Sequence, residues 1–190
     1  TKSDYELDQY ALPLNYENKW KSIIANNKTN TWRVSSFLNT KFNAKLSWRN
    51  GVLAEAYHFY SKVLSRDGRQ ATDPFETKED YDGNSTLLQA YSQLRYKPAN
   101  ELTITGGLHS MLFTFNSKAI IEPRAGIAYQ LNDNNTLLFN YGLHGQIQPL
   151  PVYLYQERLT NGTIDQSNRK LGFTKAHHFV LGYEKRLRKD

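Results

Sequence analysis

The sequence contains no cysteine, which excludes a disulfide framework, a thiolate metal site and a cysteine nucleophile. It also lacks any apolar run of about 18 residues, the length that a transmembrane helix requires. No phosphate-binding loop, dinucleotide-binding fingerprint or strained nucleophile turn is present. Basic residues outnumber acidic ones by 24 to 18, but they are scattered along the chain. We therefore predict no enzymatic activity, no cofactor, no metal site and no nucleic-acid partner.

Aromatic residues are plentiful, with 13 tyrosines, 9 phenylalanines and 3 tryptophans. Such residues are frequent in β-strands and in the interfacial girdles of membrane barrels. The clearest strand signal lies between residues 120 and 151, where two alternating runs are separated by a polar turn at 132–135. One face of these runs is apolar and consists of Ile121, Pro123, Ala125, Ile127, Tyr129, Leu131, Leu137, Phe139, Tyr141, Leu143 and Ile147.

The opposite face of the same two runs is polar or small. It consists of Glu122, Arg124, Gly126, Ala128, Gln130, Asn140, Gly142, His144, Gln146 and Gln148. Both a soluble sheet with one buried face and a transmembrane barrel with a polar lumen have this pattern.

Weaker alternation continues through most of the remaining chain and predicts strands over 31–42, 46–64, 86–96, 102–112 and 175–187. The segment 1–30 is polar and is predicted to be loop-like. The segment 31–190 is predicted to form about seven antiparallel up-and-down strands. The predicted fold class is therefore all-β, and the strands are expected to be part of a large transmembrane β-barrel.

The connections between these strands favour the membrane alternative. Short turns at 43–45, 97–101 and 132–135 fall on one side of the predicted sheet, whereas long connections at 66–85 and 148–174 fall on the other. One short turn, near Asn116, also falls on the side of the long connections. Outer-membrane barrels have short periplasmic turns and long extracellular loops. The predicted strands also exceed the roughly 9–11 residues that cross a bilayer when tilted.

Three segments, 86–110, 120–156 and 171–187, resemble consecutive strands of TonB-dependent outer-membrane receptors of the Bacteroidetes type. The resemblance implies a slice of a plugged bacterial barrel of about 22 strands, which takes up a scarce ligand by active transport. It implies outer-membrane lipid, the receptor's own plug domain, the TonB complex and a small ligand as partners. The plug domain is absent from these 190 residues, and both ends are expected to be cuts within a longer protein.

The candidate site residues lie on the polar face of the predicted strands and in the long connection at 148–174. The expected lumen-facing wall consists of Glu122, Arg124, Gln130 and Asn140, and Glu122 and Arg124 are close enough on one face to form an ion pair. The candidate ligand-binding residues are His144 on the polar face and Tyr153, Tyr155 and Gln156 in the long loop. Adjacent residues on a strand point to opposite faces, so His177 and His178 are not expected to bind one metal ion together.

An alternative function from a different class is a soluble or small β-barrel module that binds an apolar or carbohydrate ligand. In that case the apolar face would point inward, and Glu122, Arg124, Gln130 and Asn140 would lie in bulk solvent. A third possibility, a hydrolytic β-barrel enzyme, is disfavoured because the sequence shows no active-site constellation.

Overall fold

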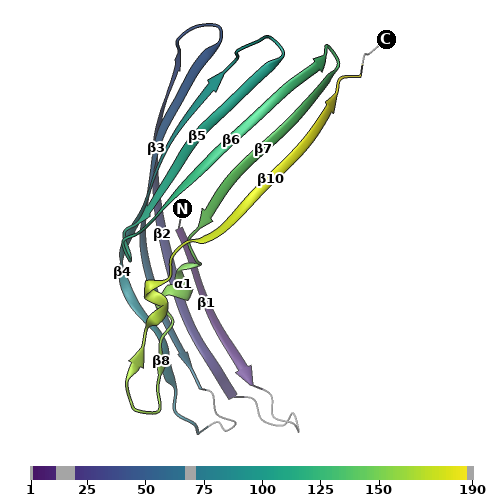
Figure 1. The fold of residues 1–190 in the computed structure, drawn as a ribbon. Coiled ribbons are helices and arrows are strands. Elements are labelled where there is room, and N and C mark those ends of the chain that lie inside the picture. The colour runs from purple at the N-terminus through teal and green to yellow at the C-terminus, as the bar shows by residue number, and fades with distance from the viewer. Residues whose placement is uncertain (1, 12–19, 67–71, 188–190) are drawn as a thin grey trace. The chain divides into compact units, whose positions relative to one another are not determined.

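The computed structural model describes residues 2–11, 20–66 and 72–187 and confirms the predicted all-β, antiparallel up-and-down fold (Figure 1). Eight strands form one sheet in the order β1-β2-β3-β4-β5-β6-β7-β10, so each strand is beside its neighbour in the chain. Their bounds are β1 (Lys2–Ala11), β2 (Trp20–Lys41), β3 (Leu46–Ser65), β4 (Glu76–Tyr96), β5 (Leu102–Phe113), β6 (Lys118–Asn132), β7 (Asn135–Gln146) and β10 (Thr174–Lys185).

The connection between β7 and β10 contains the remaining described elements. It holds the short helix α1 (Leu150–Leu154), the two-stranded pair β8 (Glu157–Arg158) and β9 (Ile164–Asp165), and the 3₁₀ turn η1 (Ser167–Lys170). Proline residues open α1, where the missing N–H costs no helical hydrogen bond. No helix in the described part of the chain is long and apolar enough to span a membrane.

The described residues fall into two compact units. Unit 1 takes its residues from 1–32, 55–86 and 148–172, and unit 2 from 33–54, 87–147 and 173–190. In unit 1, α1 contributes the buried side chains of Tyr153 and Leu154, while Phe59 of β3 stacks on Tyr81 of β4 with ring centroids 4.8 Å apart. Unit 2 contains β5, β6, β7 and β10 with the adjoining parts of β2, β3 and β4.

Asparagine side chains set several tight turns of unit 2. Asn43 Oδ1 accepts hydrogen bonds from the backbone N–H groups of Lys45 and Leu46, at 2.8 and 2.9 Å. Asn132 Oδ1 accepts one from the N–H of Asn134 at 3.1 Å, and Asn116 Oδ1 accepts one from Lys118 at 3.2 Å. An asparagine side chain can replace a backbone acceptor in this way, which is why such residues mark turns. The turns at 43–45, 97–101 and 133–134 lie at the upper end of unit 2 in Figure 1.

The register of unit 2 places the two sequence-defined faces on opposite sides of the sheet. Gly107 is paired with Arg124 and Arg124 with Gly142, so odd residues of β5 share a face with even residues of β6 and β7. The pairing of β5 with β6 and of β7 with β10 runs without a shift over the whole of each ladder. A one-residue slip would exchange the faces, so this regularity preserves the polar and apolar sides.

The structure differs from the predictions near the N-terminus. A loop was expected over 1–30, but Lys2–Ala11 forms β1 and β2 already begins at Trp20. The loop expected over 66–85 is shorter, because β4 begins at Glu76. Residues 20–30 belong to a strand through their backbone pairing with β1, although their sequence shows no clear alternation of apolar and polar residues.

Candidate functional site

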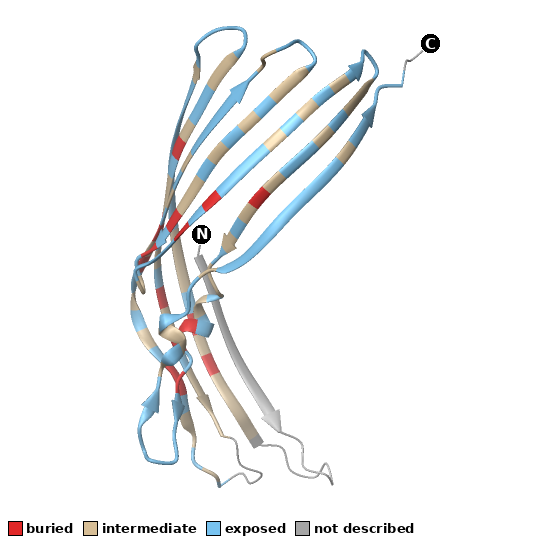
Figure 2. Ribbon diagram, viewed as in Figure 1, coloured by how far each residue is buried: buried red, intermediate tan, exposed pale blue. Residues whose placement is uncertain are grey.

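We call the apolar face of unit 2, which carries the odd-numbered residues of β6, β7 and β10 and the even-numbered residues of β5, the outer face, and the opposite face the inner face. The outer face is uncovered among the described residues. Exposed and partly exposed residues alternate along much of β5 and β7 in Figure 2, whereas nearly all of β10 is exposed. The exposed fractions of its large apolar side chains lie between 38% and 80% for Val34, Leu38, Phe42, Trp48, Val52, Leu88, Leu94, Tyr96, Ile104, Leu108, Leu112, Ile121, Ile127, Tyr129, Leu131, Leu137, Phe139, Phe179, Leu181 and Tyr183. A patch of this size marks a surface that contacts another apolar phase or partner.

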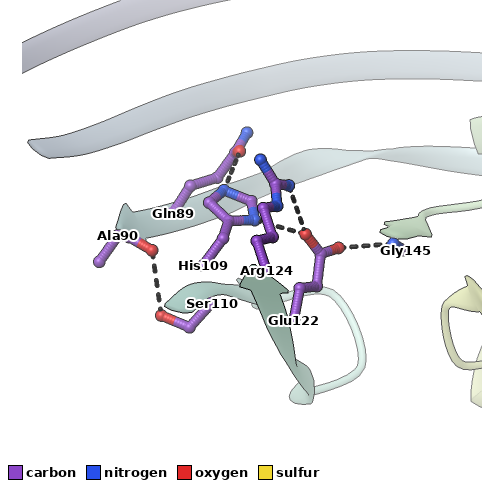
Figure 3. Close-up of polar contacts among 7 residues, drawn as sticks. All are labelled: Gln89, Ala90, His109, Ser110, Glu122, Arg124 and Gly145. Carbon is purple, nitrogen blue, oxygen red and sulfur yellow. Dashed lines mark hydrogen bonds and ion pairs between the residues drawn. The ribbon is translucent and has the colours of Figure 1, made fainter. Parts of the chain in front are cut away.

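The inner face of unit 2 holds a buried ionic cluster centred on Glu122, whose side chain is 1% exposed (Figure 3). Glu122 Oε2 lies 2.7 Å from His109 Nδ1 and 2.8 Å from Arg124 Nη2. Glu122 Oε1 accepts a hydrogen bond from the N–H of Gly145 at 2.5 Å. The ion pair expected between Glu122 and Arg124 is therefore present, and it is joined by two further partners.

The cluster extends across three strands. His109 Nε2 lies 3.2 Å from Gln89 Oε1, so β4, β5 and β6 are tied together by side chains as well as by their ladders (Figure 3). Both ring nitrogens of His109 are used, and Glu122 has three partners. A buried carboxylate is tolerated when it is fully paired in this way. The polar atoms of the cluster are therefore occupied by one another.

Gly145 is closely fitted to this cluster. A Cβ at position 145 would lie 2.6 Å from Ile120 Cδ1 and 3.0 Å from Glu122 Oε1. The glycine therefore allows its backbone N–H to approach the buried carboxylate, which a larger residue would obstruct.

His144 and Asn140 lie beside this cluster on the inner face of β7. The rings of His144 and of His178 on β10 meet edge to face, with centroids 4.8 Å apart. A Cβ on Gly142 would lie 2.8 Å from His144 Nε2, so the glycine makes room for the imidazole. Asn140 and His144 also line a concavity of about 320 Å³ together with Arg124. His144 thus has open space beside it.

The adjacent histidines of β10 point to opposite faces, as the alternation predicts. His177 stacks on Tyr141 with ring centroids 6.0 Å apart, and its Nδ1 lies 3.1 Å from the Tyr141 hydroxyl. His178 instead meets His144 on the inner face. Within residues 2–11, 20–66 and 72–187, no group of three or more His, Asp or Glu side chains is arranged to hold a metal ion.

Gln130, the fourth wall residue, is partly buried near the turn that joins β6 to β7. Its backbone N–H donates to the carbonyl of Glu101 at 2.8 Å, and it is paired with Thr136 in the ladder. This hydrogen bond links β6 to the turn that precedes β5.

The three loop candidates lie in unit 1 and differ in accessibility. Tyr153 is 1% exposed, and its hydroxyl accepts a hydrogen bond from the N–H of Gln148 at 3.0 Å. Gln156 is buried, and its backbone N–H donates to the carbonyl of Lys78 at 2.7 Å. Tyr155 is 40% exposed and is the most accessible of the three. The structure brings these residues together at α1, whereas His144 belongs to unit 2.

A second buried polar cluster lies in unit 1. Ser61 Oγ is 2.5 Å from Glu79 Oε2 and is also hydrogen-bonded to Asn27 Oδ1. Burial raises the pKa of the Glu79 carboxyl, although the hydrogen bond with Ser61 opposes this effect. A hydroxyl has a single proton, so Ser61 can donate to only one of these two acceptors at a time.

The geometry defines a class of structure, an antiparallel sheet with an exposed apolar face and a polar face stiffened by buried ionic contacts. Comparison of the chain with protein-family models, with curated proteins and with solved structures found no match.

Proposed function

We propose that this chain is a segment of the wall of a TonB-dependent outer-membrane receptor, which serves the active uptake of a scarce ligand. The observation that carries the proposal is the exposed apolar outer face of unit 2, opposite a polar inner face. A bilayer would cover the first face, and a hydrated lumen would meet the second.

Energetics support a bilayer as the covering phase. Full burial of one large apolar side chain contributes about 1.5–3 kcal/mol relative to exposure to water. The outer face carries many such side chains that are 38–80% exposed, so contact with water leaves a large favourable burial term unused. Contact with hydrocarbon removes this surface from water without requiring a second sheet.

The arrangement of turns supports the same proposal. The connections at 43–45, 97–101 and 133–134 are short and lie at one end of unit 2. At the opposite end the β5–β6 turn at 114–117 is also short, whereas the connection between Gln146 and Thr174 is long and carries its own helix and strand pair. In the proposal the short turns face the periplasm and the long connection faces the outside of the cell. Two separate ligand contacts are proposed, Tyr155 with its accessible ring in unit 1 and the inner-face His144 in unit 2.

The proposal assigns the remaining parts of transport to partners. Outer-membrane lipid contacts the outer face, a plug domain of the receptor contacts the inner face, and the TonB complex supplies energy. The wall residues Glu122, Arg124, Gln130 and Asn140 position and stiffen the sheet. None of them performs a covalent step.

The test is localisation combined with heat-modifiable gel mobility. The protein is expressed in a bacterial host with all the flanking sequence that its gene encodes, and its membranes are fractionated. We expect recovery in the outer membrane and a folded band in detergent that shifts after boiling. Recovery in the water-soluble fraction with no shift on boiling would reject the proposal and would favour the soluble binding module.

A further inference from the structure

A second concave region lies on unit 2, beside the short turns at 43–45 and 97–101. It has a volume of about 540 Å³ and is lined by the ends of β2, β3 and β4. Its basic lining residues are Lys41, Lys45, Arg49, Arg95 and Lys97. No aspartate or glutamate lines it among the described residues. We call this region the basic pocket.

The cations of the basic pocket are not neutralised by the described part of the chain. Within residues 2–11, 20–66 and 72–187, none of the five side chains has a carboxylate within 4.0 Å. Elsewhere in unit 2, Arg124 is paired with the buried Glu122. Five like charges around one concavity repel one another, and an anion bound among them would relieve the repulsion.

Aromatic rings preorganise one of these cations. The guanidinium carbon of Arg49 lies 5.4 Å from the centroid of the Phe37 ring and 5.8 Å from that of Tyr91. A Cβ at Gly51 would lie 2.5 Å from ring atoms of Tyr91, so only a glycine at this position leaves room for the ring. Contact with ring faces holds a guanidinium in position while its N–H groups remain free to bind a planar anion.

Neutral polar groups complete the lining. The side chains of Asn39, Asn43, Gln93 and Thr105 offer hydrogen-bond donors beside the cations. Asn43 Oδ1 is already occupied by the backbone N–H groups of its turn, so its amide nitrogen remains as a donor. Five cations with several amide and hydroxyl groups match a ligand that carries more than one phosphate or carboxylate group.

We propose that the basic pocket binds a small soluble polyanion bearing two or more phosphate or carboxylate groups. The volume lies within the range of about 300–1,000 Å³ that is usual for small-molecule sites. Anionic lipid headgroups offer the same phosphate chemistry. Three of the five cations, Lys41, Arg49 and Arg95, alternate with the exposed apolar residues Phe42, Trp48 and Tyr96, and therefore share the inner face. A soluble ligand is favoured because this face is opposite the one proposed to contact lipid.

The site goes beyond the proposed function and stands separately from it. The pocket follows from the sheet and its turns, and it does not require that a bilayer cover the outer face. Failure of the protein to enter a membrane would reject the receptor proposal and leave the anion site intact. Failure to bind a polyanion would reject the anion site and leave the receptor proposal intact.

The test uses inorganic tripolyphosphate as the probe and the purified full chain in detergent. Binding is followed by calorimetry. We expect saturable binding that weakens as salt is added. Arg95→Gln should weaken it about tenfold, a loss of about 1.4 kcal/mol. Arg49→Gln should have a similar effect, whereas Arg49→Lys should retain part of the affinity.

The matched control is Lys175→Gln, which removes the same charge from an exposed position on β10 outside the pocket. It should leave tripolyphosphate binding unchanged. The absence of saturable binding, or an equal loss with Lys175→Gln and Arg95→Gln, would overturn the proposal. Arg95 has no side-chain ion pair in the described chain, so Arg95→Gln should fold normally.

A parallel measurement uses vesicles containing phosphatidylglycerol. Binding to these vesicles that depends on Arg95, without binding of tripolyphosphate, would assign the pocket to lipid headgroups and overturn the soluble ligand. Binding of tripolyphosphate, with vesicle binding unaffected by Arg95→Gln, would support the soluble polyanion.

Discussion

Glu122 is a carboxylate that unit 2 has buried almost completely and surrounded with donors. His109 and Arg124 contact its Oε2 atom, and the N–H of Gly145 donates a hydrogen bond to its Oε1 atom. Removing Glu122 leaves His109, whose side chain is 14% exposed, and the N–H of Gly145 without their acceptor, whereas the Arg124 side chain is 45% exposed and stays in contact with water. The cluster is therefore a position at which a single substitution should have a large effect on stability.

We expect Glu122→Ala to lower the free energy of unfolding by about 1–3 kcal/mol, because His109 and the N–H of Gly145 lose their buried acceptor. Denaturant titration of the folded chain measures this change. Glu184→Ala, at an exposed position of β10, is the control and should change stability by less than about 0.5 kcal/mol. Similar losses for the two variants would show that Glu122 does not depend on its partners.

The stability of unit 1 should depend on pH through Glu79. Burial raises the pKa of its carboxyl, so folding favours the protonated acid. Its contribution is full below the ordinary carboxyl pKa of about 4.3 and is lost as pH rises through the higher folded-state value. Hydrogen exchange of β3 and β4 amides should therefore quicken as pH rises over this window, beyond the intrinsic change. Glu79→Gln should remove that excess, whereas the exposed Glu157→Gln should retain it.

Among these side-chain contacts, the sequence predicted only the ion pair between Glu122 and Arg124, which lies within one strand. Glu122 and Arg124 are two residues apart, so alternation alone placed them on one face. The contributions of His109 and Gln89 depend on the register between β4, β5 and β6, which a single strand does not specify. The sequence did not predict the basic pocket for the same reason. Arg49 and Arg95 are far apart in the chain, and the basic residues show no cluster in the sequence.

At the scale of the strand, two consecutive glycines of β5 differ sharply in their surroundings. A Cβ on Gly107 would lie 2.7 Å from the backbone oxygen of Ser92 and 3.1 Å from the Cα of Gln93. A Cβ on Gly106 would meet nothing within 4 Å. Gly107 therefore permits a close approach of β4 and β5, whereas Gly106 does not serve this purpose.

We expect Gly107→Ala to destabilise the pairing of β4 with β5 by about 1–3 kcal/mol, since backbone atoms must move to accept the methyl group. Gly106→Ala should be neutral within about 0.5 kcal/mol. Denaturant midpoints of the two variants provide the comparison. A larger loss for Gly106→Ala would contradict the register described for this ladder.

Strand positions were predictable where apolar and polar residues alternate and where asparagine marks the turns. The turns at Asn43, Asn116 and Asn132 are held by side-chain oxygens, which is a local signal. The region from Trp20 to Asn30 lacks clear alternation and belongs to a strand through its backbone pairing with β1. Such pairing depends on a distant segment, so local sequence patterns did not reveal it.

At the scale of the whole molecule, the two faces should respond differently to charge. Ile127 is 47% exposed on the outer face, and Ala128 is next to it on the inner face. If lipid covers the outer face, Ile127→Arg should cost about 2–4 kcal/mol near the bilayer midplane. Ala128→Arg, which points to the polar side, should cost much less. Folded yield measured by heat-modifiable mobility distinguishes them, and equal yields would reject the assignment of the faces.

Gln146 and Thr174 are partners in the ladder between β7 and β10. The chain therefore leaves the sheet and returns to it at the same rung, and all that lies between them is an insertion that the ladder does not need. Such a segment can diverge in length and composition while the strands beneath it keep their register. The exposed strands β8 and β9 are accordingly the place for a grafted epitope or an exchanged loop, whereas Tyr153 and Leu154 of α1 are buried and Gln156 is bonded to Lys78 of β4. A change of length at 157–165 would leave both α1 and the ladder between β7 and β10 in place.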